Sequence, residues 1–312
     1  MRDDILGHLL RASPAAAECG DVTRWQRAYL QLARTWKNPM DRAMVAGFSA
    51  DRAAWAFAGG YQCALQALFP GLPEDALAAL CVTEEEGTHP RAIRTALHRA
   101  GPGWRLEGAK RWTTLGPQGA LFLVLAREAQ IEGERAALRI VRVPSAAAGV
   151  RIEPMPPTRF VPEVPHARLV FDAVALPEDA LLPGDGWTQY AKPFRTVEDA
   201  HVNAALIAYL LREARRLGWR HAWIGRAAAL LLALRALAAE DPSRPQTHIA
   251  LAGILETAAS VVAEAESNWN ASPGDAAHAR WLRDRELLNV ASSARTKRTE
   301  SAWRSLTGTS GN

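Results

Sequence analysis

Hydrophobic positions in the first quarter of the chain recur at helical spacing. Four of them, at spacings of four, three and four, lie on one predicted helical face: Trp25, Tyr29, Leu32 and Trp36. Asn38-Pro39 ends that helix. A second helical run starts at Asp51 and stops at Pro70-Gly71, and Gly59-Gly60 inside it is either a weak point or a place of close packing. Residues 1–79 are therefore predicted to form an N-terminal helical domain.

From about residue 80 the pattern changes to short apolar runs bounded by Gly and Pro. Six of these runs are predicted as strands: 79–82, 95–98, 104–106, 121–126, 138–143 and 169–174. The connections contain too little helix for a parallel, doubly wound sheet. We therefore predict a middle β domain over residues 80–186, built as an antiparallel β-barrel or sandwich.

After Gly184-Asp185-Gly186 the helical pattern returns and continues to the end. Four helices are predicted: 203–218, 221–239, 248–269 and 276–306. Short turns between helices favour antiparallel neighbours, so residues 187–312 are predicted to form a C-terminal four-helix bundle. The predicted fold class is α+β, in the order helices, β domain, helical bundle.

Composition supports a folded chain with one basic segment. The 312 residues are 48% hydrophobic, which is enough for a sizeable core and excludes disorder throughout. The net charge of +4 arises within residues 280–304, which hold seven basic and three acidic side chains. Stacking by Trp281 and Trp303 with phosphate pairing by arginine is one reading of this segment. A solvated bundle surface is the better account, so no nucleic-acid partner is predicted.

Cysteine usage and the apolar runs bear on the compartment. The chain has three cysteines at wide spacing, Cys19, Cys63 and Cys81, which indicates neither a disulfide framework nor a zinc ribbon. Acidic residues stand near the start, where a signal peptide needs basic ones. The longest apolar run, 227–239, falls short of the ~20 residues of a membrane helix. We therefore expect a cytoplasmic protein with no membrane partner.

Common signature motifs for nucleotide binding, metalloproteases and hydrolases are absent from the sequence. The acidic run Glu84-Glu85-Glu86 lies near His89, and these four side chains could be imagined as metal ligands. Adjacent acids with a single histidine do not give converging geometry. This segment is therefore predicted to be a solvated loop, and no metal is predicted.

Residues 81–127 resemble the middle domain of the acyl-CoA dehydrogenase family. The matching segments are Thr83-Glu84, Gly87-Thr88 and Leu106-Glu107-Gly108-Ala109-Lys110-Arg111-Trp112-Thr113-Thr114, followed by Gly149-Val150, Val170-Phe171-Asp172-Ala173-Val174-Ala175-Leu176-Pro177 and Gly184-Asp185-Gly186. The resemblance implies the same three-part architecture, with shortened N-terminal helices.

The same resemblance implies flavin chemistry. In the family, FAD takes a hydride from an acyl-thioester substrate, and groups at positions corresponding to Val82, Thr83, Trp112 and Thr114 contact the flavin. Trp112 would cover one ring face and Thr114 would approach N5, although both are also good strand and core residues. Thr88 corresponds to a substrate-binding position.

Several departures from the family pattern leave the activity open. The Arg-x-x-Phe-Gly segment is replaced by Leu217-Gly218-Trp219-Arg220, and the commonest catalytic Glu and a glycine motif lie beyond residue 312, which suggests a divergent, truncated member. A subgroup of the family carries its base early in the first bundle helix, where Glu198 is the candidate. The alternative is that Thr196 caps this helix and that Glu198-Asp199 favour its first turn.

Two functions follow from these observations. One is a flavin-dependent oxidoreductase that transfers hydride from an acyl-thioester-like small molecule to FAD. The other is a catalytically degenerate scaffold or partner subunit in which tight FAD binding is lost. Glu85 and Glu86 would oppose a polyanionic CoA unless they face solvent. The family resemblance also implies a homodimer or homotetramer formed through the bundle.

Overall fold

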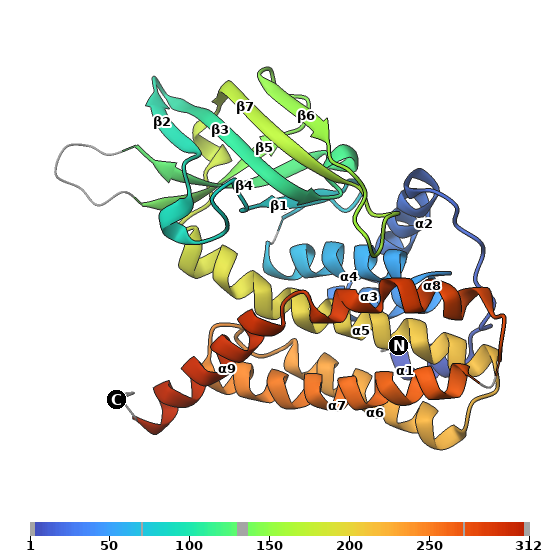
Figure 1. The fold of residues 1–312 in the computed structure, drawn as a ribbon. Helices are drawn as coiled ribbons and strands as arrows, with labels where there is room; N and C mark the ends of the chain where they lie inside the picture. Colours follow the sequence, from blue (N-terminus) through green and yellow to red (C-terminus); the bar gives the residue numbers. More distant parts are fainter. Residues whose placement is uncertain (1–3, 70, 130–136, 271, 309–312) are drawn as a thin grey trace. The chain divides into compact units, whose positions relative to one another are not determined.

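The computed structural model describes residues 4–69, 71–129, 137–270 and 272–308. The chain folds into two compact units, drawn in Figure 1. The helical unit comprises Met1–Ala67, Thr158–Glu163 and Thr196–Asn312, and the β unit comprises Leu68–Pro157 and Val164–Arg195. Each unit is therefore assembled from separate stretches of the chain.

The helical unit begins with four helices. They are α1 (Ile5–Arg11), α2 (Val22–Thr35), α3 (Pro39–Ser49) and α4 (Ala53–Leu68). The sequence predicts α2 and α4 but not α3. The Asn38 side chain accepts a hydrogen bond from the Asp41 N–H at 3.0 Å, and Pro39 occupies the first helical position. The dipeptide that ends α2 therefore also starts α3.

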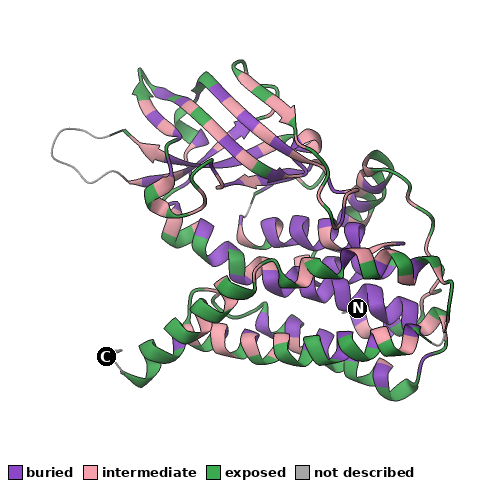
Figure 2. Cartoon of the chain, in the orientation of Figure 1, coloured by how far each residue is buried: buried purple, intermediate pink, exposed green. Residues whose placement is uncertain are grey.

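The first bundle helix, α5 (Lys192–Arg216), packs closely against α3 and α4 through glycine. A Cβ added at Gly47 of α3 would lie 2.0 Å from the carbonyl oxygen of Ala205. One added at Gly60 of α4 would lie 2.8 Å from the Cα of Val202. Of the two readings of Gly59-Gly60, close packing is therefore confirmed, and Figure 2 shows that α5 is buried over most of its length.

The other bundle helices are α6 (His221–Leu237), α7 (Pro245–Trp269), α8 (Ala276–Asp284) and α9 (Ser292–Thr307). The single helix predicted over 276–306 is wrong, because a 3₁₀ turn, Arg285–Asn289, separates α8 from α9. The Arg295 guanidinium donates to the Leu288 carbonyl at 2.6 Å, so a side chain satisfies a backbone acceptor that the break exposes. The helix predicted over residues 203–218 also starts too late in the sequence, because α5 begins at Lys192.

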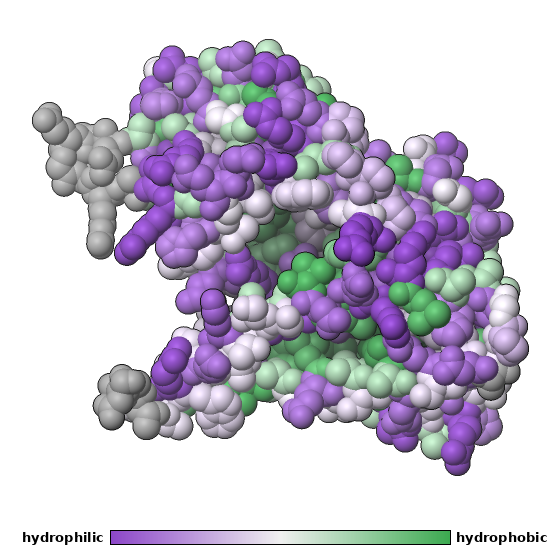
Figure 3. Space-filling model, viewed as in Figure 1, coloured by the Kyte–Doolittle hydropathy of each residue, from purple (hydrophilic) through white to green (hydrophobic). Residues whose placement is uncertain are grey.

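By length and composition, α7 could cross a membrane, and it is the one such helix among the described residues. A single helix of this kind is a weak indication, because a core helix of a soluble protein passes the same test. In this structure α7 packs against α6 and α9. Figure 3 shows hydrophobic surface on the helical unit between α7 and α8.

The β unit is built on one curled sheet, which confirms the α+β class. Its described strands are β1 (Ala78–Cys81), β2 (Ala96–Ala100), β3 (Gly103–Thr114), β4 (Leu121–Glu128), β5 (Leu138–Pro144), β6 (Val150–Pro154) and β7 (His166–Leu176). The order is β1-β4-β2-β3-β7-β6, with β5 paired to β4. Most pairs are antiparallel as predicted, but β4 runs parallel to both β1 and β2. Alternate side chains of these strands form the core, among them Leu106, Phe122 and Leu169.

Candidate functional site

The segment after β1 is tied to β3 by hydrogen bonds. The Arg111 N–H donates to the Thr83 carbonyl at 2.8 Å, and the Lys110 ammonium donates to the Val82 carbonyl at 3.4 Å. Lys110 and Val82 are 28 residues apart in sequence, so only the fold brings them together. Val82 and Thr83 consequently lie beside the strand that carries Trp112 and Thr114. The four residues predicted to contact a flavin thus belong to one region of the β unit.

A buried ion pair anchors this region. Glu84 and Lys110 are 7% and 0% exposed, and the Lys110 Nζ lies 2.6 Å from Glu84 Oε1. The carboxylate also accepts hydrogen bonds from the Arg94 N–H at 2.6 Å and from the Thr95 hydroxyl at 2.8 Å. Donors therefore surround the Glu84 carboxylate on the loop side and on the strand side.

This environment keeps the Glu84 carboxylate ionised. Burial alone would raise the pKa of Glu84, but the Lys110 charge and the hydrogen bonds outweigh it and lower that pKa below its usual 4.5. Burial lowers the pKa of Lys110, and the Glu84 charge opposes that shift. The prediction that the acidic run is a solvated loop is therefore wrong for Glu84. A run of three acids looks exposed in sequence, and the partner that buries one of them stands far along the chain.

Trp112 has an unusual backbone and an exposed ring. Its φ of +55° is left-handed, and the register between β3 and β7 shifts between Lys110 and Thr113. Such a conformation costs on the order of 1–3 kcal/mol in a residue with a Cβ. The indole is 45% exposed, and its edge-to-face neighbour is His166, with centroids 6.0 Å apart. The bulge therefore turns a large aromatic ring out of the sheet, and the core reading of Trp112 is excluded within the β unit.

Hydrogen-bond donors without a strong acceptor lie in the same region of the β unit as that ring. Within the described part of the chain, the acceptor for the Trp112 N–H is the Met155 thioether, which lies 3.4 Å away and is a weak acceptor. Among the described residues, the half-buried Thr83 and Thr114 have no partner for their hydroxyls. An exposed aromatic face with free donors beside it suits a flat ring that carries acceptor atoms along its edge. These residues consequently fit an isoalloxazine, the ring system implied by the family resemblance.

Thr88 lies in the loop that follows β1, and its hydrogen-bond partner is not evident from the sequence. The exposed Arg195 guanidinium donates to the Thr88 hydroxyl oxygen at 3.1 Å, which leaves the hydroxyl proton free to donate. Arg195 adds a positive charge at the predicted substrate-binding position. No signal in the sequence marks it, because 107 residues separate the two side chains.

The remaining acidic residues of the loop face solvent. Glu85 pairs with Arg111, and Glu86 pairs with Arg94 at 3.2 Å. Both carboxylates are more than half exposed and neutralised, so the expected conflict with a polyanionic substrate is reduced. His89 accepts a hydrogen bond from the Arg91 N–H at 3.2 Å. Across the described residues, no group of three or more His, Cys, Asp or Glu side chains converges on a metal position.

Glu198, the predicted base, belongs to the helical unit. It is half-buried and lies inside α5, whose first residue is Lys192. The alternative reading of this segment as a cap is wrong, because Thr196 is an interior helical residue whose hydroxyl accepts from Arg298 at 3.5 Å. The neighbouring Asp199 is also not a first-turn acid. It is buried and pairs with Arg295 at 2.8 Å and with Arg298 at 2.6 Å, which joins α5 to α9.

His201 is a buried helix residue with a satisfied ring nitrogen. Its Nδ1 lies 2.8 Å from the Val197 carbonyl. Burial lowers the pKa of His201 to about 4, only partly opposed by that hydrogen bond. The imidazole is therefore neutral near pH 7, with the proton on Nδ1 directed at the carbonyl.

Most charges of the basic C-terminal segment are paired inside the helical unit. Trp281 is 1% exposed and faces the interior, where its indole N–H donates to Glu266 at 3.3 Å. Most of the arginines pair with carboxylates within the helical unit: Arg283 with Glu163 and Asp284, Arg285 with Glu266, and Arg295 and Arg298 with Asp199. The supposed cluster of aromatic and basic side chains therefore serves to join helices.

Comparisons with known proteins agree with this description of the β unit. Residues 79–174 match the model of the acyl-CoA dehydrogenase middle domain. A curated relative, the 3-sulfinopropanoyl-CoA desulfinase of Paraburkholderia xenovorans (strain LB400), is 28% identical over 133 residues. That match covers 42% of this chain and 34% of the relative, so it spans about a third of the relative's length.

Solved structures share the fold along most of the chain. A glutaryl-CoA dehydrogenase from Mycobacterium smegmatis in complex with FADH2 matches with a TM-score of 0.61 at 16% identity, covering 98% of this chain and 93% of its own. The butyryl-CoA dehydrogenase from Megasphaera elsdenii matches with a TM-score of 0.61 at 14% identity, covering 92% of this chain and 100% of its own. At these identities the matches show a common fold.

Proposed function

We propose, on the premise that this chain belongs to the acyl-CoA dehydrogenase family, that it is a flavin-dependent oxidoreductase acting on an acyl-thioester-like small molecule. The observation that carries the proposal is the exposed, left-handed Trp112 with unpartnered donors beside it. Backbone strain persists where the surrounding structure enforces it, and in enzymes it concentrates at sites that bind or react.

The roles follow from the chemistry of the side chains. Trp112 would cover one face of the bound ring, and the Thr83 and Thr114 hydroxyls would donate to its polar edge. Donors placed before the reaction stabilise the negative charge that develops there. Val82 would contribute backbone contacts, which its tie to Lys110 keeps in position.

When bound, FAD supplies the acceptor for a hydride. The chain's own contribution at the substrate is twofold. The Thr88 hydroxyl would donate to the acyl carbonyl, and the Glu198 carboxylate would take the proton from the adjacent carbon. A proton and a hydride would thus leave neighbouring carbons, which become joined by a double bond.

Flavin binding is the first test. Purified protein should be yellow, or should take up added FAD with quenching of the flavin fluorescence. Trp112→Asn should weaken uptake strongly while the protein stays folded, since Asn tolerates a left-handed backbone. Trp303→Ala, which removes a similarly exposed indole from α9, is the matched control and should bind FAD as the unmodified chain does. A colourless protein that takes up no FAD would favour the scaffold reading instead.

Catalysis is the second test. Under anaerobic conditions, a panel of acyl-CoA thioesters is screened for bleaching of the visible flavin absorbance. Glu198→Gln should retain FAD but lose bleaching, whereas Glu256→Gln, on the exposed side of α7, should leave it unchanged. Bleaching that persists in Glu198→Gln would remove Glu198 from the proposed mechanism.

A further inference from the structure

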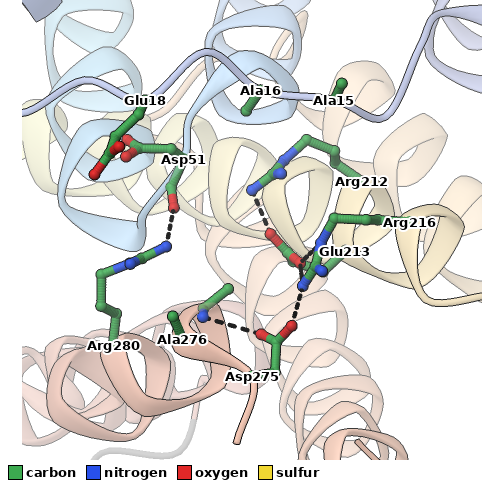
Figure 4. Close-up of a pocket in the computed structure, with 11 residues that line it drawn as sticks. Ala15, Ala16, Glu18, Asp51, Arg212, Glu213, Arg216, Asp275, Ala276 and Arg280 are labelled. Carbon is green, nitrogen blue, oxygen red and sulfur yellow. Dashed lines mark hydrogen bonds and ion pairs between the residues drawn. The ribbon is translucent and has the colours of Figure 1, made fainter.

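A polar cavity lies wholly within the helical unit. Its volume is about 440 Å³, and the N-terminal segment, α5 and α8 line it (Figure 4). α5 contributes Arg212, Glu213 and Arg216, and α8 contributes Ala276 and Arg280. Figure 4 shows the guanidinium groups of Arg212 and Arg280 reaching into the cavity from different helices. None of these residues takes part in the flavin site proposed above.

The acceptors at this cavity are already used. Glu213 is paired with Arg212 and, at 2.5 Å, with Arg216. Asp275 is paired with Arg216 at 2.7 Å and accepts the Ala277 N–H at 2.9 Å. These contacts satisfy the buried carboxylates without any further cation.

The donors, in contrast, are in excess. Arg212 is 4% exposed, and its Nε is buried without a hydrogen-bond partner in the described part of the chain. The buried Nε of Arg280 also has no hydrogen-bond partner there. Among the described residues, that guanidinium makes one hydrogen bond, to the Asp51 carbonyl at 3.3 Å. No carboxylate among the described residues pairs with Arg280. The nearby Tyr209 hydroxyl, also buried, has no partner there either.

Two further carboxylates line the cavity but do not balance this excess. Glu18 is exposed at the rim, where water screens its charge, and Asp51 is held by Arg52 at 2.7 Å and by the Cys19 N–H at 3.3 Å. A buried guanidinium N–H without an acceptor is costly, because the donor has lost its contact with water. The cavity therefore lacks a negatively charged hydrogen-bond acceptor between Arg212 and Arg280.

We propose that this cavity binds a small oxyanion, through a carboxylate or a phosphate group held between Arg212 and Arg280. Both groups present oxygen acceptors at the spacing of guanidinium N–H donors, so they share one recognition chemistry. The volume of about 440 Å³ admits a small metabolite. The proposal does not depend on flavin binding, because every residue in it lies in the helical unit.

The test uses the full chain and two probes. Acetate and inorganic phosphate are each titrated calorimetrically into the protein, with sodium chloride at equal ionic strength as the reference. Saturable binding is expected for at least one probe, and the tighter of the two identifies the source of the oxyanion. Absence of saturable binding for both would overturn the proposal.

Three variants locate the binding. Arg280→Gln removes the cation that has no carboxylate partner and should weaken binding roughly tenfold or more. Ala276→Glu places a carboxylate at the exposed first turn of α8, where it suits the helix dipole, and should also weaken binding through repulsion or by occupying the site. The control Arg226→Gln, which removes a surface cation paired with Glu264, should bind as the unmodified chain does. Binding unchanged in both cavity variants would place the anion elsewhere and refute the proposal.

Discussion

The ion pair between Lys110 and Glu84 shows how a single contact decides whether a loop residue is exposed or buried. The family resemblance in the sequence predicts a ligand-binding role for Thr83, Thr88, Trp112 and Thr114. It does not show that Glu84 is buried, because the partner that neutralises it lies 26 residues further along. Contacts of that kind depend on strand pairing, which no local pattern encodes.

We predict that Lys110→Met lowers the free energy of unfolding by about 3 kcal/mol, because it leaves Glu84 buried without its cation. Adding Glu84→Gln to that variant should recover part of the loss. The measurement is urea unfolding. Arg105→Met is the control on the same strand, since its partner Glu107 is 45% exposed, and it should cost under about 1 kcal/mol. An equal effect in both single variants would contradict the importance of burial.

The neutral His201 predicts a dependence of stability on pH. The folded-state pKa of about 4 lies below the usual 6.5, because burial opposes the charged form. Between these values the unfolded chain binds a proton that the folded chain does not, so stability falls as pH drops from 6.5 toward 4. The full loss is about 3 kcal/mol. His201→Gln should flatten this part of the curve, whereas His221→Gln, at an exposed position, should not.

At the scale of the elements, the strongly periodic segments were predictable and the interruptions were not. The stripe of Trp25 and Tyr29 gives α2, and the apolar runs give most strands of the sheet. The start of α3 was missed because Asn38-Pro39 serves two helices at once. The break before α9 was missed because a side chain, the Arg295 guanidinium, satisfies the exposed Leu288 carbonyl in place of a backbone N–H. Hydrophobic periodicity indicates which face of a helix is buried. It does not indicate where a side chain replaces a backbone N–H as a hydrogen-bond donor.

Close packing of α3 on α5 gives a prediction for glycine. Gly47→Ala should lower the free energy of unfolding by about 1–3 kcal/mol, because the new methyl group meets the Ala205 carbonyl, which a helix backbone holds in place. Gly225→Ala in α6 is the matched helical control, with open space around the added atom, and should instead stabilise by up to about 1 kcal/mol. Thermal and urea unfolding of both variants test this. If Gly47→Ala leaves the free energy of unfolding unchanged, α3 and α5 can move apart at little cost in free energy.

For the whole molecule, net charge is a poor guide to binding. The excess of +4 originates in the C-terminal segment, yet most arginines there are paired within the helical unit. Lys297 and Arg304 are the exposed residues of this segment that remain without a paired carboxylate in the described chain. A pattern of basic residues indicates a polyanion only when the structure leaves their charges free.

Accordingly, duplex DNA should show no binding at ~100 mM salt in a gel-shift or anisotropy titration. Any association at lower salt should disappear on adding salt. Binding that survives ~100 mM salt and is lost in the double variant Lys297→Gln/Arg304→Gln would contradict this expectation.

The short segment Thr158–Glu163 has a consequence for how the molecule is made. It leaves the β unit to join the helices, where the Val161 N–H donates to Asp284 at 2.8 Å and Glu163 pairs with Arg283 at 2.8 Å. During translation, α1 to α4 emerge first, and most of α5, which packs against α3 and α4, emerges only after the β unit. The sheet, in contrast, is complete once residue 195 has left the ribosome. The earliest part of the chain to be synthesised therefore keeps apolar surface exposed until α5 has emerged, which makes the nascent chain prone to aggregation.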